Sequence, residues 1–452
     1  MSKEGSLEAP TRHPIPWTDP DFFDAGKIDA ELRRVFDICH GCRRCFNLCD
    51  SFPRLFDLID DSPSGEPDSV ESAGFKSVVD ACTFCDMCFM TKCPYVPPHE
   101  FDLDFPHLML RYRAAEQARG EKSFRETQLA KTDRNGKWAG LAPGLANWAT
   151  AEGNFGMRKV LADVGGIHRE AALPKYHGKT LMDRAADSPA IDTTAPGHGR
   201  KVVIYATCFA NYNEPAMGTA ARAVLARNGV ETQMVYPACC GMPQWEQGNL
   251  EQVAKNARKI AAEMAGWIDR GHAVIALVPS CALMLKFEWP LLLPDNEDVA
   301  RLSENTYDIT EYIVALAKED GLADGLTPLE GGVTLHLACH ARAQNMGAKG
   351  AEMLRLIPDT DVTVVERCSG HGGAWGIMEQ NFDVALKVGK PAARLTLKAD
   401  RPWVVSECPL AASHLRQGME RLAPPENPEV PRTAAHPILL LAQAYGLQEI
   451  EG

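Results

Sequence analysis

Fifteen cysteines are the residues of this 452-residue chain best suited to chemistry, and they fall into two groups. Eight lie between residues 39 and 93, and seven lie between residues 208 and 408. The eight form two runs, Cys39-x2-Cys42-x2-Cys45-x3-Cys49 and Cys82-x2-Cys85-x2-Cys88-x4-Cys93. A CxxCxxC loop can wrap three thiolates around three irons of one cubane, so each run predicts a [4Fe–4S] cluster that transfers electrons.

The last cysteine of each run lies too far along the chain to close back easily, and in two-cluster ferredoxins it ligates the other cluster. We therefore expect one cluster to be bound by Cys39, Cys42, Cys45 and Cys93. We expect the other cluster to be bound by Cys82, Cys85, Cys88 and Cys49. The second run has four residues rather than three before Cys93, so Cys93 is the first ligand to test. Structural zinc is the alternative, but zinc sites usually use two separated CxxC pairs and would leave the middle cysteine of each triplet unused.

The overall charge limits the possible partners and compartments. The chain has 60 acidic and 47 basic residues, a formal net charge of -13, which argues against nucleic-acid binding because there is no excess of cations to displace counterions from phosphate. No export signal is found, so secretion is not expected. No run of 18 apolar residues is found, so no transmembrane segment is predicted. We expect a cytoplasmic protein, with attachment to the inner face of the membrane as the alternative. In that compartment cysteines favour metal or redox chemistry over disulfides.

The gap between the two groups of cysteines divides the chain into five parts. Residues 1–30, with four prolines, predict a disordered lead-in, and residues 31–120 predict a helical domain that holds two clusters. Residues 121–199 predict a connector with weak helix signals, whose last dozen residues are typical of a flexible linker. Residues 200–328 and 329–450 predict two α/β domains.

The two α/β domains are predicted from an internal repeat. Short apolar, β-branched runs alternate with helical segments, and the expected parallel strands are residues 201–206, 273–279, 333–337, 362–365 and 403–406. Three cysteine landmarks recur after such strands at offsets of 131, 129 and 127 residues, namely Cys208 with Cys339, Cys239 with Cys368, and Cys281 with Cys408. Ligands of parallel α/β sheets gather beyond the carboxyl ends of the strands, where these cysteines fall.

The vicinal pair in Cys239-Cys240-Gly241, with Cys208 before it and Cys281 after it, resembles the cysteine-rich CCG domain, of pattern C…CCG…C(xxC). This domain is found in pairs in heterodisulfide reductase, in the iron–sulfur subunits of glycolate and lactate oxidases, and in one of the subunits of anaerobic glycerol-3-phosphate dehydrogenase. The resemblance implies an α+β multidomain fold, in which a helical two-[4Fe–4S] ferredoxin-like domain precedes two repeated α/β CCG domains.

The resemblance also implies site residues. In the heterodisulfide enzyme, CCG cysteines hold a noncubane cluster that cleaves a disulfide. The first set here is similar at Cys208, Cys239, Cys240 and Cys281, so one further noncubane cluster is an expectation for the first CCG domain. Its closing CxxC is incomplete, because Met284 stands where a second cysteine would be.

The second set is less complete. It keeps Cys339, Cys368 and Cys408, but Ser369 and Ala411 replace two cysteines of the pattern. Two nearby histidines, His340 and His371, are further candidate ligands, since imidazole can replace thiolate on iron. The alternative is that both histidines are ordinary hydrogen-bonded residues of a domain kept for its shape.

The absence of several sequence motifs reduces the number of candidate functions. No GxGxxG, P-loop or HExxH is found, so we expect no flavin or NAD site on this chain and a flavoprotein dehydrogenase or another redox protein as partner. The leading hypothesis is an electron-transfer subunit of an oxidoreductase that relays electrons between this partner and a CCG site or a quinone. A disulfide reductase and a non-enzymatic redox sensor are the alternatives. Lys286 and Glu288 follow Cys281 and either line its site or begin a solvated helix.

Overall fold

Two parallel four-stranded sheets organise the C-terminal part of the chain. The computed structural model describes residues 8–424 and 429–448. The first sheet contains β1 (Lys201–Tyr205), β2 (Glu231–Val235), β3 (Ala273–Ala276) and β4 (Thr306–Asp308), in the order β2-β1-β3-β4. The second contains β5 (Val333–His336), β6 (Val362–Val365), β7 (Trp403–Ser406) and β8 (Arg432–Ala434), in the order β6-β5-β7-β8. The identical order and parallel pairing confirm the predicted α/β duplication.

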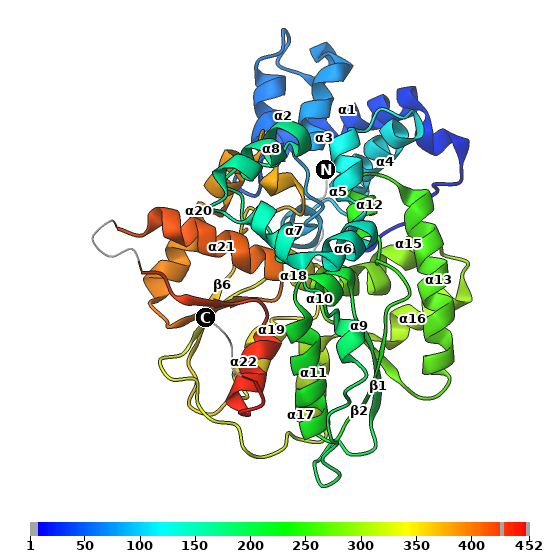
Figure 1. Cartoon of the computed structure of the whole chain (residues 1–452). Coiled ribbons are helices and arrows are strands. Elements are labelled where there is room, and N and C mark those ends of the chain that lie inside the picture. Colours follow the sequence, from blue (N-terminus) through cyan, green and yellow to red (C-terminus); the bar gives the residue numbers. More distant parts are fainter. Residues whose placement is uncertain (1–7, 425–428, 449–452) are drawn as a thin grey trace.

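Helices cover both sheets and connect their strands (Figure 1). Around the first sheet they are α10 (Cys208–Tyr212), α11 (Pro215–Arg227), α12 (Met242–Glu246), α13 (Leu250–Ile268), α14 (Pro279–Leu283), α15 (Trp289–Leu292), α16 (Glu297–Asn305) and α17 (Ile309–Glu319). Around the second they are α18 (Cys339–Ala343), α19 (Lys349–Leu354), α20 (Phe382–Ala399), α21 (Pro409–Leu422) and α22 (Pro437–Ala444). In α13 the residues at helical spacing, among them Val253, Ala257 and Ile260, are fully buried, so the helix is held to the sheet by its apolar face.

The N-terminal cysteine runs lie among helices α1 (Ala25–Cys42), α2 (Ser51–Asp60), α3 (Phe75–Asp80) and α4 (Phe105–Ala118), drawn in blue to cyan in Figure 1. An aromatic core holds them together. The Phe52 and Phe105 ring centroids are 4.8 Å apart, and Phe36 contacts both Phe75 and Phe105. Burial of these rings supplies much of the stability of the helical region.

The expectation of a disordered lead-in is wrong for residues 8–30, while residues 1–7 lie outside the described part of the chain. Ile15 and Phe22 are buried, and Pro20–Phe23 form the 3₁₀ turn η1. The Ile15 amide donates to the Leu291 carbonyl at 2.8 Å, and the Trp17 indole donates to the Leu292 carbonyl at the same distance. The segment therefore runs as an ordered strap from the N-terminal helices to the first α/β domain.

The connector also differs from expectation, because its residues 124–165 are largely helical. It contains α5 (Phe124–Leu129), α6 (Thr132–Leu141), α7 (Pro143–Thr150), α8 (Phe155–Gly165) and α9 (Leu181–Arg184). The buried guanidinium of Arg158 ties this segment together by donating to the carbonyls of Thr150, His168 and Ala171. The last dozen residues are not a free linker, since the Asp192 and Gly197 amides donate to carbonyls at the end of α11 and just beyond it.

Candidate functional site

The first group of N-terminal cysteines gathers where α1 ends. Cys39 and Cys42 lie in its last turn, and Arg43, at φ 53°, turns the chain towards Cys45. Burial raises the pKa of Cys39 well above its usual value, and the neighbouring Cys93, Cys45 and Cys42 raise it further. The structure therefore brings together the four cysteines that the spacing assigns to one cluster, although their role as ligands stays a prediction.

The second group gathers around the loop before α4. The pKa of Cys49 is raised by burial and by the neighbouring Cys85 and Cys82. The pKa of Cys88 is raised by burial and by Cys85, Cys82 and Cys49. These four cysteines are again the expected set. Residues Cys88–Lys92 form the π-helical turn η4, closed by the Cys93 amide on the Cys88 carbonyl at 2.8 Å. A π turn holds one residue more than an α turn, so it accommodates the unusual four-residue spacing before Cys93.

The donor set in both groups fits iron–sulfur clusters. The first group contains four partly buried thiols, and the second contains two buried and two partly buried thiols; as thiolates, the members of each group would repel one another. The four thiolates of each group would hold one cubane, each on its own iron, and the bound iron would offset the repulsion between them. Within the described ranges, no three His, Cys, Asp or Glu side chains are arranged around a position for a single metal ion.

The third group lies at the carboxyl ends of the first sheet. Cys208 begins α10 directly after β1, the vicinal Cys239 and Cys240 follow β2, and Cys281 lies in α14 after β3. The Sγ atoms of Cys208 and Cys239 are 3.6 Å apart. Hydrogen bonds with Cys208 and Cys240 lower the pKa of Cys239, and its charge in turn helps to raise the pKa of Cys208. The parallel strand order brings these four cysteines together, as expected.

Side chains that sequence reasoning missed hold the vicinal pair in place. Asp133 of α6 accepts a hydrogen bond from the Cys239 amide at 3.1 Å and another from the Tyr236 hydroxyl. The Asn256 amide donates to the Cys239 carbonyl at 3.0 Å, and the buried Trp289 indole donates to the Cys240 carbonyl at 3.2 Å. Nothing in the sequence marks Asp133, because it belongs to the connector, more than a hundred residues before the pair.

The fourth group, Cys339, Cys368 and Cys408, lies at the carboxyl ends of the second sheet. Burial raises the pKa of Cys339, and Cys85, Cys368 and Cys408 raise it further. After Cys368 the chain makes a turn that requires glycine. Gly370 has φ 81°, and a Cβ there would lie 2.0 Å from the Ala385 carbonyl oxygen.

The two candidate histidines have different surroundings. Both ring nitrogens of His340 are engaged by protein, Nδ1 with the Ser280 hydroxyl at 2.8 Å and Nε2 with the Phe84 carbonyl at 2.9 Å, which favours a structural role. His371 Nδ1 accepts a hydrogen bond from the Gly373 amide at 3.0 Å. Burial and the nearby His414 lower the pKa of His371 to about 3, so its imidazole is neutral, the form that binds metal.

The four groups follow one another through the molecule. Cys45 of the first group helps to raise the pKa of Cys88 in the second, and Cys85 of the second does the same for Cys339 in the fourth. Cys281 of the third group helps to raise the pKa of Cys408 in the fourth. The resulting order is first, second, fourth and third, and in each neighbouring pair a cysteine of one group raises the pKa of a cysteine in the next.

One cavity of about 1350 Å³ connects the last three groups of this series. Its lining includes the cysteines at positions 49, 85, 208, 240, 281, 339, 368 and 408. Glu246 also lies on the cavity, and burial raises the pKa of its carboxyl group to about 7, against the effect of Arg113. The cavity therefore gives a small molecule access to sulfurs of both α/β domains.

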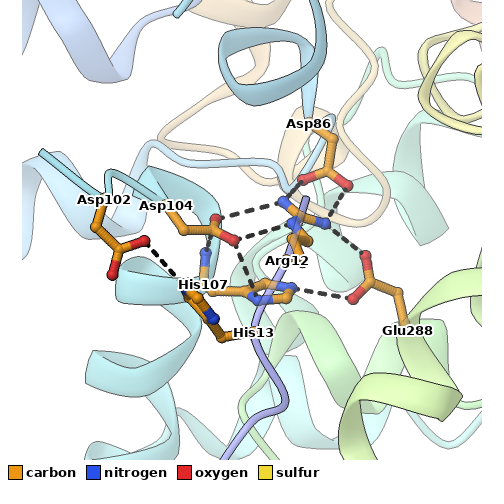
Figure 2. A network of polar contacts seen from close by, with 7 residues as sticks. All are labelled: Arg12, His13, Asp86, Asp102, Asp104, His107 and Glu288. Carbon is orange, nitrogen blue, oxygen red and sulfur yellow. Dashed lines mark hydrogen bonds and ion pairs between the residues drawn. The ribbon is translucent and has the colours of Figure 1, made fainter. Parts of the chain in front are cut away.

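A buried ionic network fixes the N-terminal strap beside the second group (Figure 2). Arg12 contacts Asp86 at 2.9 Å, Asp104 at 2.9 Å and Glu288 at 3.0 Å, and its guanidinium lies 4.2 Å from the Phe89 ring centroid. Glu288 is buried, so the interpretation of this residue as a solvated helix start is wrong.

His107 extends the network. Its Nε2 lies 3.0 Å from Glu288 Oε2, and His13 pairs with Asp102 at the exposed edge in Figure 2. Burial opposes ionisation of Asp104, but Arg12 and His107 outweigh it and lower the pKa of that carboxyl group. Asp86 lies between two predicted cluster ligands, so the network joins the second group of cysteines to the first α/β domain.

Comparisons with known proteins agree with this architecture. The family described as the cysteine-rich CCG domain matches residues 202–286 and 333–416. The chain is 27% identical over 325 residues to one of the subunits of the anaerobic glycerol-3-phosphate dehydrogenase of Escherichia coli. The aligned region covers 71% of this chain and 77% of that protein. It is 30% identical over 218 residues to lactate utilization protein A of Bacillus licheniformis, with 44% and 87% covered.

A more distant relative is one of the subunits of the fumarate reductase (CoM/CoB) of Methanothermobacter marburgensis, 24% identical over 237 residues, with 51% of this chain and 45% of that protein covered. Among the described residues, no helix is long and apolar enough to cross a membrane.

Proposed function

This chain belongs to the family of iron–sulfur proteins with paired cysteine-rich CCG domains, and we propose that it is the subunit of an oxidoreductase complex that relays electrons along its four groups of cysteines. The observation that carries the proposal is the arrangement of the groups, because cysteines of the second, fourth and third groups line one cavity and the first group raises the pKa of Cys88 in the second. An isolated binding site would not require such an arrangement. A relay requires it, because single electrons move only between centres that lie close together.

In this proposal, two [4Fe–4S] clusters are bound by the first two groups of cysteines in a helical ferredoxin-like domain, and the first CCG domain holds a further cluster. Bound clusters take up and release single electrons. The residues of the chain hold the thiolates, bury them and keep neighbouring groups in contact. The electron donor or acceptor is a partner protein of the complex, a flavoprotein dehydrogenase being the first candidate. The names of the relatives, subunits of a glycerol-3-phosphate dehydrogenase and of a fumarate reductase, support a dehydrogenase or reductase complex as the setting.

Iron analysis and anaerobic EPR of the full chain test the proposal. We expect two interacting [4Fe–4S] signals after reduction and iron beyond the roughly eight atoms of two cubanes. Cys239→Ala should lose the additional iron and keep both N-terminal signals, while the control Met284→Leu should keep all iron. Unchanged iron in Cys239→Ala would remove the CCG cluster from the proposal. Absence of interacting signals in the unmodified protein would overturn the relay.

Disulfide reduction is a second candidate, favoured by the cavity that reaches Cys208, Cys240 and Cys281. In that reaction, two electrons and two protons convert one disulfide into two thiols. Reduced viologen supplies the electrons in a test, and thiol formation from a small disulfide is measured. Turnover that Cys240→Ala abolishes would support this candidate, whereas absence of thiol formation with all iron in place would exclude it.

A further inference from the structure

The connector helices expose an unusual number of large apolar side chains. Thirteen large hydrophobic residues are exposed in the described part of the chain, and eight of them lie on α5 to α8. We call these eight the connector face, and they are Phe124, Trp138, Leu141, Leu145, Trp148, Phe155, Val160 and Val164. Leu141 is 85% exposed and Phe155 is 82% exposed, so the residues that the structure describes leave both side chains largely uncovered. An apolar surface of this kind marks an interaction site.

The same helices form one wall of the cysteine cavity. Leu129 of α5, Asn135 of α6, Thr150 of α7 and Leu161 of α8 line it from the inside. Figure 1 shows α6 and α7, in cyan, in the middle of the molecule, between the N-terminal helices and the two sheets. The helices that carry the connector face therefore also contribute residues to the cavity that holds the candidate redox sites.

The charge around the connector face is opposite to that of the whole chain. Residues 124–179 contain nine Lys and Arg, of which Arg158 is buried, against five Asp and Glu, whereas the complete chain has 47 against 60. Lys131, Lys137 and Lys159 are exposed and make no ion pair within the described ranges. Two of the acids, Glu152 and Glu170, are paired with Arg416 and Arg421 of α21, which further reduces the negative charge here.

We propose that the connector face docks on an anionic lipid bilayer, with α6 to α8 lying in the interface. Exposed Trp, Phe and Leu side chains beside unpaired lysines are the combination that binds such an interface, since the apolar groups enter the headgroup boundary and the lysines contact anionic lipids. Trp is enriched at this depth because its ring is both apolar and a hydrogen-bond donor. The local positive charge favours lipid over a partner protein that would need only the apolar surface.

This inference deepens the proposed function, because it rests on the relay and places the cavity wall against the membrane. A lipid-soluble electron carrier would then reach the cavity without crossing bulk water. The docking itself does not require electron transfer, so the two proposals are tested by different measurements: vesicle binding for the first, and EPR with iron content for the second.

The experiment is co-sedimentation of the anaerobically purified full chain with vesicles of phosphatidylcholine, alone or mixed with phosphatidylglycerol. We expect binding to the anionic vesicles that weakens as salt is raised. The double variant Trp138→Ser, Trp148→Ser should bind at least about tenfold more weakly, because burial of two large apolar side chains is lost. The variant Lys137→Glu, Lys159→Glu should lose its preference for anionic vesicles.

Matched controls change exposed residues elsewhere. Phe287→Ser with Leu447→Ser removes two exposed apolar side chains, and Lys255→Glu with Arg258→Glu removes two cations on α13. Both controls should bind like the unmodified protein, and all variants should keep their iron and EPR signals. No binding to anionic vesicles, equal loss in the controls, or capture of a partner protein by the connector face in place of lipid would each overturn the proposal.

Discussion

Replacement of Arg12 by methionine should destabilise the protein strongly, although the residue lies near the N-terminus. The side chain of Arg12 is 11% exposed and contacts three carboxylates, two of which, on Asp86 and Glu288, are 5% and 3% exposed. Removing one partner of a buried ionic group leaves charges without compensation, at a cost of about 3–5 kcal/mol. The cation–π contact with Phe89 would be lost as well.

The pH dependence follows from the carboxyl groups. Burial alone would raise the pKa values of Asp104 and Glu288, but Arg12 and His107 lower them in the folded protein. Their contribution to stability is therefore present above the pKa of the unfolded chain and is lost as pH falls through the folded pKa. Without Arg12 both groups take up protons at higher pH, so the difference between Arg12→Met and the unmodified protein should shrink between pH 8 and pH 5.5.

The assay is urea unfolding under anaerobic conditions, followed by tryptophan fluorescence and by cluster absorbance, since the two signals need not change together. Arg12→Lys, which keeps the charge, should lose less than Arg12→Met. Arg34→Met, which removes a half-exposed pair with Glu31 on α1, should cost no more than about 1 kcal/mol. An Arg12→Met variant as stable as Arg34→Met, or one whose deficit grows at low pH, would refute the reasoning.

Three further changes test other features. Cys93→Ser should remove about four of eight N-terminal irons and leave the EPR signal of the second group, whereas loss of the second group's signal instead would contradict the exchanged ligands. Gly370→Ala should cost more than about 1 kcal/mol in unfolding experiments because its Cβ would meet the Ala385 carbonyl, while Gly446→Ala, with φ 67° and open space, should cost less. The folded pKa of Glu246, about 7, lies above the unfolded value, so the unmodified protein should lose about 2 kcal/mol of stability between pH 5 and pH 8. Glu246→Gln should remove this loss, and equal pH profiles of the two proteins would contradict the prediction.

Most features of the fold that could be predicted from the sequence were predicted from the spacing of its residues. Apolar β-branched runs predicted β1, β3, β5, β6 and β7 because buried parallel strands need such residues throughout. Strands β2, β4 and β8 were missed, since β2 is only partly buried and the other two have three residues each. Short edge strands take their conformation from their neighbours, and their own sequences hold little signal.

The sequence predicted which cysteines form each group, but it did not predict how the groups are arranged relative to one another. The spacing of the cysteines and the repeat indicated four groups, and the structure brings each together. The order of the groups, the shared cavity and the support from Asp133 depend on how helices far apart in the sequence pack. The order of the strap could not be predicted for a related reason: the prolines and polar side chains of residues 8–24 are typical of a disordered segment unless partners such as Glu288 are known.

The N-terminal strap also has a consequence for the order of events during synthesis. Arg12 and Glu288 are 276 residues apart, so the ribosome, at about 5–20 residues per second, needs roughly 14–55 s to deliver the second after the first. During that interval both runs of N-terminal cysteines have emerged, and Arg12 can contact Asp86 and Asp104 but not Glu288. The contact of the strap with the first α/β domain is thus completed only after both runs of cysteines have left the ribosome.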